Sequence, residues 1–120
     1  MVAARLRSDE RPGEVLEVTV LSAWRDRLRG LLGTDEDAPA VLLTLCSSIH
    51  TFGMRYPLDV AFIGERGEVL LVKRGLSPGR GASHPRARCV VERPAREGGW
   101  LEEGEHLWAC SISADGVGAL

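Results

Sequence analysis

The order of apolar and polar residues predicts a chain built mainly of short strands. The first clear strand is predicted at residues 14–22, which read EVLEVTVLS and alternate Val18 and Val20 with Glu17 and Thr19. Comparable apolar runs predict five more strands, at residues 40–45, 58–63, 68–73, 87–92 and 106–112. These runs are shorter than a typical helix, and turn-forming residues separate them.

One segment has the spacing of a helix instead. Ser22 offers an N-cap for AWRDRLRGLLG, in which Trp24, Leu28 and either Leu31 or Leu32 recur at helical intervals. Gly33 then offers a stop for the helix. This segment therefore predicts one main helix with an apolar face.

Glycine and proline indicate where the strands are connected. The link GERG at residues 64–67 holds two glycines between apolar runs, which predicts a hairpin. Residues 75–85 read GLSPGRGASHP and predict a loop. Pro57 disfavours helical backbone in the residue before it, so the segment that precedes Leu58 is also predicted as a loop.

Six strands and one helix predict an α+β fold that is mainly antiparallel β-structure. We expect a small barrel or half-barrel with the helix covering one opening. A chain of 120 residues fits one domain. We assign that domain to residues 14–112, with a flexible N-terminal arm or short edge strand at residues 1–13 and a flexible tail at residues 113–120.

Charge, cysteine content and the absence of common motifs argue against several classes of function. A net charge of −2 argues against a nucleic-acid-binding protein, which is usually basic. The 3 cysteines lack a paired spacing, and neither a secretory signal nor a membrane-spanning apolar run is present, so we expect a reduced, cytoplasmic monomer without membrane contact. The motifs GxxxxGK[ST], GxGxxG, CxxC, HExxH and GxSxG are all absent, which disfavours nucleotide, dinucleotide and common hydrolase chemistry.

Several of these segments together resemble a known family. They are WRDRLRGLLG, the segment CSSIHTFGMRYPLDVAFI, the glycine hairpin, a Pro-Gly-Arg loop and a Val-Val-Glu strand. In this combination the chain resembles the bacterial and archaeal family called domain of unknown function 192, from about Val15 to Ile112, most specifically at residues 50–63. The resemblance implies a compact, β-rich domain and supplies no mechanism. The chain differs at Gly53, where an aromatic residue is common, and at Glu105, where Asp is common.

The segment 46–63 also gathers the chemically versatile side chains. Cys46, His50 and Met54 are four residues apart, and on a helix they would offer ligands for a soft metal. Because Pro57 disfavours that helix, we assign no metal and leave any cofactor open. The simpler interpretation makes Cys46 and Met54 buried apolar side chains.

His50 and Asp59 form a second candidate site. A carboxylate that faces an imidazole raises its pKa and orients it as a general base. Adding Cys46 as nucleophile gives a possible small enzyme. In the structural alternative, Asp59 accepts amide hydrogens where the loop meets the strand, while His50 and Thr51 bond loop carbonyls.

Arginines form the third candidate. Arg55 and Arg80 would line a pocket for a carboxylate or phosphate if the loop at residues 75–85 folds back over the loop that carries Arg55. Gly79 and Gly81 would let a ligand approach the backbone closely. The structural alternative is a solvated loop with scattered charge.

These candidates lead to two hypotheses of function. The first is a small binding domain whose cleft takes a small anionic ligand or a partner segment. Its predicted binding residues are His50, Thr51, Met54, Arg55, Asp59 and Arg80. The alternative is a small enzyme that uses His50 and Asp59 as a general-base pair, with Cys46 as nucleophile.

Overall fold

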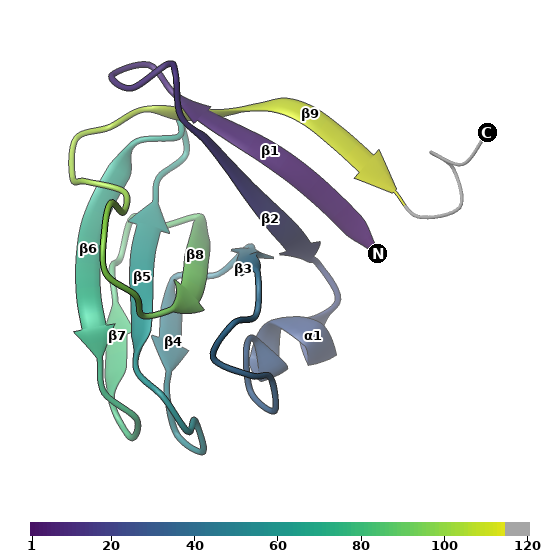
Figure 1. Ribbon diagram of the computed structural model, residues 1–120, viewed down its shortest axis with the longest axis vertical. Coiled ribbons are helices and arrows are strands. Elements are labelled where there is room, and N and C mark those ends of the chain that lie inside the picture. The colour runs from purple at the N-terminus through teal and green to yellow at the C-terminus, as the bar shows by residue number, and fades with distance from the viewer. Residues whose placement is uncertain (115–120) are drawn as a thin grey trace.

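The computed structural model describes residues 1–114, which form nine strands and one helix (Figure 1). The elements are β1 (Val2–Ser8), β2 (Val15–Leu21), α1 (Trp24–Arg29), β3 (Ala40–Thr44), β4 (Ser48–His50), β5 (Leu58–Ile63), β6 (Val69–Leu76), β7 (Gly81–Ser83), β8 (Cys89–Pro94) and β9 (Leu107–Ala114). All six strands predicted from the sequence are confirmed, with shifts of at most three residues at their ends and none for the strand at residues 58–63. Of the predicted tail, residues 113 and 114 belong to β9, and residues 115–120 lie outside the described residues.

Seven strands form one mixed sheet in the order β6-β5-β8-β3-β2-β1-β9. Every pairing is antiparallel except that of β2 with β3, which is parallel. The expected barrel is not formed, because the edge strands β6 and β9 do not pair with each other. Instead the connection from β8 to β9 inserts Trp100 and Leu101 into the core, and a single bridge joins Glu68 to His106.

The N-terminal residues are not a flexible arm. β1 lies inside the sheet, between β2 and β9, and buries Ala4, Leu6 and Ser8. The charges of Arg5 and Arg7 suggest an exposed arm, but these side chains alternate with the buried ones, which is the pattern of a half-buried strand. The prediction of an arm or short edge strand was therefore wrong.

β5 is buried on both faces, and this divides the core in two. Leu58, Val60 and Phe62 pack in one apolar cluster, whereas Ala61 and Ile63 pack in the other. This division follows from the alternation of side chains along a strand. Two neighbouring residues of β5 therefore face two separate environments.

The helix α1 is shorter than predicted. It begins after Ala23, which makes no side-chain cap, rather than after Ser22, and it ends at Gly30 rather than at Gly33. Gly30 has φ 50°, a left-handed backbone that glycine adopts without strain. None of its 6 residues is buried: Trp24 and Leu28 of the predicted apolar face are exposed, whereas Leu31, which follows the helix, is buried in the core. None of the described residues forms a helix long and apolar enough to cross a membrane.

The two predicted loops contain short strands. β4 and β7 pair antiparallel, with Ser48 opposite Ser83 and His50 opposite Gly81. Small and polar residues hide this pairing from a sequence pattern, because neither strand has an apolar alternation of its own. In Figure 1 this second sheet lies behind β5 and β6.

Candidate functional site

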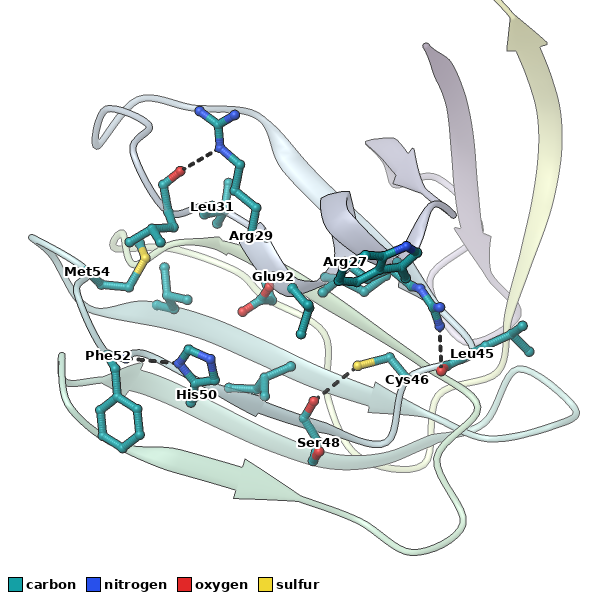
Figure 2. A pocket seen from close by; sticks show the side chains of 17 residues that line it. Arg27, Arg29, Leu31, Leu45, Cys46, Ser48, His50, Phe52, Met54 and Glu92 are labelled. Atoms are coloured by element: carbon teal, nitrogen blue, oxygen red, sulfur yellow. Dashed lines mark hydrogen bonds between the residues drawn. The ribbon is translucent and has the colours of Figure 1, made fainter.

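A cleft of about 300 Å³ opens between α1 with its following turn and the chain around β4 (Figure 2). Leu43, Leu58 and Glu92, from the strands β3, β5 and β8, also line it. The volume lies at the small end of the range of ligand pockets. The cleft is therefore large enough for a small organic molecule.

The rim of this cleft is apolar and exposed. In residues 1–114, nine large apolar side chains are strongly exposed to solvent, and five of them line this one cleft. These five, which we call the apolar rim, are Trp24, Leu28, Leu32, Leu45 and Phe52, with exposed fractions from 37% to 81%. Exposed apolar side chains gathered around one hollow are typical of a binding site.

Backbone geometry helps to keep the apolar rim in place. Leu45 has φ 48°, a left-handed conformation that costs free energy in a residue with a branched side chain. Arg27 holds this turn, because its Nη1 donates to the carbonyl oxygens of Thr44 at 3.1 Å and Leu45 at 3.0 Å. Gly53, on the opposite wall of the cleft, leaves room for the Leu32 side chain, since a Cβ there would lie 3.2 Å from Cδ1 of Leu32. The aromatic residue common at this position would crowd the rim.

Three of the predicted site residues meet in the cleft: Cys46, His50 and Met54 all line it. The His50 Nδ1 accepts a hydrogen bond from the Phe52 amide at 3.3 Å, and the two rings stack at 5.1 Å. The Cys46 thiol donates to the carbonyl of Ser48 at 3.1 Å, and burial raises the pKa of this thiol. Residues 1–114 contain no group of three or more His, Cys, Asp or Glu side chains that is able to hold a metal ion.

Asp59 does not belong to this cleft. Its carboxylate is 1% exposed and accepts hydrogen bonds from the Arg74 side chain at 3.1 Å, the Arg93 side chain at 2.9 Å and the Gly75 amide at 3.0 Å. Burial alone would raise the pKa of Asp59, but these hydrogen bonds outweigh it and lower the pKa. The predicted pairing of His50 with Asp59 is therefore wrong, because alternation along β5 turns Asp59 away from the cleft.

Thr51 has a structural position. It is fully buried, and its Oγ1 donates to the Ser77 carbonyl at 2.6 Å and accepts from the Arg80 amide at 2.8 Å. Its own amide donates to the Arg80 carbonyl at 2.8 Å. These bonds fold the loop of residues 75–85 back over the β4 segment, as the anion-pocket hypothesis required.

The two arginines predicted for the anion pocket do not contribute to this cleft. The side chains of Arg55 and Arg80 are exposed, and neither lines the cleft. The predicted set of binding residues is thus divided: His50 and Met54 share the cleft, whereas Thr51, Arg55, Asp59 and Arg80 lie outside its lining.

Glu92 is the residue of the cleft that sequence reasoning missed. It is 3% exposed, and it lies on β8 opposite Val41 of β3 and Val60 of β5. Among the described residues its carboxyl has neither a hydrogen bond nor an ion pair, and burial raises its pKa to about 7. The signal in the sequence was a glutamate in phase with the buried Val90, but the buried face could not be chosen from β8 alone.

Two solved structures share this fold. A candidate transcription regulator from Sinorhizobium meliloti 1021 is 20% identical over 90% of this chain and 92% of its own, with a TM-score of 0.73. A protein of unknown function from Novosphingobium aromaticivorans DSM 12444 is 12% identical over 88% of this chain and 83% of its own, with a TM-score of 0.72. At these identities the likeness concerns the fold alone.

Comparison with curated proteins finds no match. A family model does match: DUF192, described as "Uncharacterized ACR", covers residues 4–104. This match extends over most of the sheet and the whole cleft, and it confirms the resemblance first carried by residues 50–63. The chain belongs to the DUF192 family.

Proposed function

We propose that this chain is a small binding domain whose cleft takes a predominantly apolar small molecule. The observation that carries the proposal is the apolar rim, which gathers at one hollow five of the nine strongly exposed large apolar side chains of residues 1–114. Covering such side chains with a ligand removes apolar surface from water and contributes about 25 cal/mol per Å². A ligand that fills the cleft therefore gains most of its affinity at the rim.

The polar groups of the cleft favour this ligand over the anion expected from the sequence. Arg27 and Arg29 line the cleft, but each already donates to main-chain carbonyls: Nη1 of Arg27 to those of Thr44 and Leu45, and Nε of Arg29 to that of Leu32. Among the described residues the buried Nε of Arg27 has no partner. The carboxyl of Glu92 would repel an anion that entered. A ligand with an apolar body needs no free cation in the cleft, and the Glu92 carboxyl does not repel it.

The enzyme hypothesis has less support. A nucleophilic cysteine requires a lowered pKa, whereas burial raises the pKa of the Cys46 thiol. The carboxylate expected to orient His50 is bound by Arg74 and Arg93 instead. We therefore propose binding rather than catalysis.

A fluorescence titration with the uncharged probe N-phenylnaphthylamine tests the proposal. We expect the purified protein to enhance the emission of the probe saturably. Leu28→Gln should weaken this binding by about tenfold, because a rim leucine loses its apolar contact. Ile112→Gln is the matched control, since Ile112 is 69% exposed, as against 65% for Leu28, but lies on β9 away from the cleft.

Three results would overturn the proposal. The first is no saturable binding by the folded protein, and the second is an equal loss in Leu28→Gln and Ile112→Gln. The third is a dimer, detected by size-exclusion chromatography, that dissociates in Leu28→Gln only. That outcome would assign the apolar rim to a second copy of the chain.

A further inference from the structure

The interior of the cleft contains a carboxyl group without a partner. Glu92 is 97% buried by its neighbours, since only 3% of it is exposed, and it is a lining residue of the cleft. Figure 2 shows its carboxyl between the α1 side of the cleft and His50. Within residues 1–114 no hydrogen bond or ion pair reaches it.

The other buried carboxylates of the described chain are all satisfied. Asp59 accepts from two arginines and two amides. Glu105, which is 4% exposed, accepts from Arg11 at 2.7 Å and 2.8 Å and from Ser8 at 2.7 Å. Buried polar groups are almost always hydrogen-bonded, so an unpaired one at the wall of a cleft indicates a missing partner.

Local geometry keeps this carboxyl accessible. The chain turns at Gly30 directly beside it, and a Cβ at that position would lie 2.9 Å from Oε1 of Glu92. Glycine therefore leaves room around the oxygen at the place where α1 ends. A side chain there would occupy the space that a ligand group requires.

No cation of the cleft supplies the missing partner. The titratable or charged groups that line it are Arg27 and Arg29 from α1, and Cys46 and His50 from the chain around β4. The two arginines donate to carbonyl oxygens, and the Cys46 thiol donates to the Ser48 carbonyl. The neighbours of Glu92 on β3 and β5, Val41 and Val60, carry no polar side chain.

We infer that the ligand of this cleft is an amine with an apolar body, and that its ammonium group donates to the Glu92 carboxylate. This inference rests on the proposed binding function and names the class of ligand. The ammonium group enters first and reaches Glu92, while the apolar body remains at the rim beside Trp24, Leu28 and Phe52. The ion pair also removes the cost of an uncompensated buried charge. Burial raises the pKa of Glu92 to about 7, so the carboxylate form that pairs with an ammonium group is favoured above that pH.

Three probes with one apolar body test the inference: phenylbutylamine, phenylbutanol and phenylbutyrate. We expect isothermal titration at about pH 8 to give binding of the amine at least about tenfold tighter than that of the alcohol, because a charge-assisted hydrogen bond contributes more than a neutral one. Phenylbutyrate should bind most weakly. This comparison uses the unmodified protein and so does not depend on the folding of a variant.

A pair of variants then tests whether the preference for the amine depends on Glu92. Glu92→Gln should reduce the preference for the amine over the alcohol to about twofold or less, because the amide lacks the charge. Glu97→Gln changes the net charge equally at an exposed position outside the cleft and should retain the full preference.

The possible failures are distinguishable. If N-phenylnaphthylamine binds but the amine and the alcohol bind equally, the inference on Glu92 is wrong while the binding function stands. If phenylbutyrate binds tightest, the ligand is an anion and the inference is likewise overturned. If an amine preference persists in Glu92→Gln, another group recognises the ammonium. If none of the probes binds, the proposed function itself fails.

Discussion

Two buried carboxylates on adjacent strands have opposite surroundings. In the ladder of β5 and β8, Asp59 lies opposite Arg93, and the next pair is Val60 with Glu92. Because side chains alternate along a strand, Asp59 and Glu92 lie on opposite faces of the same sheet. Asp59 accepts four hydrogen bonds, from the side chains of Arg74 and Arg93 and from the amides of Gly75 and Arg96. Glu92 accepts none among the described residues.

The comparison distinguishes a buried carboxylate that stabilises the fold, Asp59, from one that destabilises it, Glu92. Removing a carboxylate from water costs free energy on either face, but only around Asp59 do donors replace the lost water. The pKa of Asp59 is lowered in consequence, although burial opposes this, whereas burial raises the pKa of Glu92 to about 7. A side chain that costs stability beside an accessible cleft is better explained by a ligand than by the fold.

The largest expected effect comes from breaking the satisfied site. Asp59→Ala should lower the free energy of unfolding by about 3–5 kcal/mol, because Arg93 is left buried without its counter-charge. Arg93 is held beside the Trp100 ring, with Cζ 4.4 Å from the ring centroid, and its side chain is only 11% exposed. Urea denaturation measures the difference. The exposed Asp37→Ala serves as control, and an equal effect in both variants would contradict a special role for the Asp59 site.

A smaller effect on stability is expected at Glu92, and its dependence on pH is opposite to that of Asp59. Its folded pKa of about 7 lies above the ordinary 4.5, so its favourable contribution is complete below about pH 4.5 and is lost as the pH rises through 7. The loss is at most about 3 kcal/mol. Glu92→Gln should therefore match the unmodified protein near pH 5 and exceed its stability near pH 8. Asp59 behaves in the reverse way, because its contribution is present above the ordinary pKa of 3.8 and is lost as the pH falls below it.

Thermal unfolding of both proteins across this pH range measures the Glu92 effect. The exposed Glu97→Gln should leave the slope of stability against pH unchanged. A Glu92→Gln variant that is less stable than the unmodified protein at pH 8 would mean that the carboxylate has a partner in the folded state, and the contrast with Asp59 would be lost.

The smallest expected effect on stability comes from a backbone position, Gly30, which lies beside Glu92. Gly30→Ala places a Cβ at φ 50° and 2.9 Å from Oε1 of Glu92, whereas Gly79→Ala meets only the backbone penalty, since φ is 79° and no atom lies within 4 Å. We expect Gly79→Ala to cost about 1 kcal/mol and Gly30→Ala about 1 kcal/mol more. In a Glu92→Ala background the excess should vanish, as measured by urea denaturation. If the extra loss of stability persists in that background, Gly30 is required only for the backbone turn that ends the helix.

The success of the strand predictions has a local cause. Runs such as residues 14–22 and 58–63 carry their own alternation or apolar content, and this periodicity is readable without knowledge of the partners. The failures occurred where the local signal was weak or ambiguous. The polar character of residues 1–13 suggested an arm, and the short polar strands β4 and β7 suggested loops. In α1 the helical spacing was right, but Trp24 and Leu28 line a cleft instead of entering the core.

The sequence by itself determined most strands, the family resemblance and the segment that contributes Cys46, His50 and Met54 to the cleft. The tertiary structure alone decided the open sheet, the arginines that surround Asp59 and the arrival of Glu92 beside the helix end. The physical reason is the range of the interactions. Periodicity and turn chemistry act between neighbours in the chain, whereas Asp59 is satisfied, and Glu92 enters the cleft, through contacts with residues distant in the sequence.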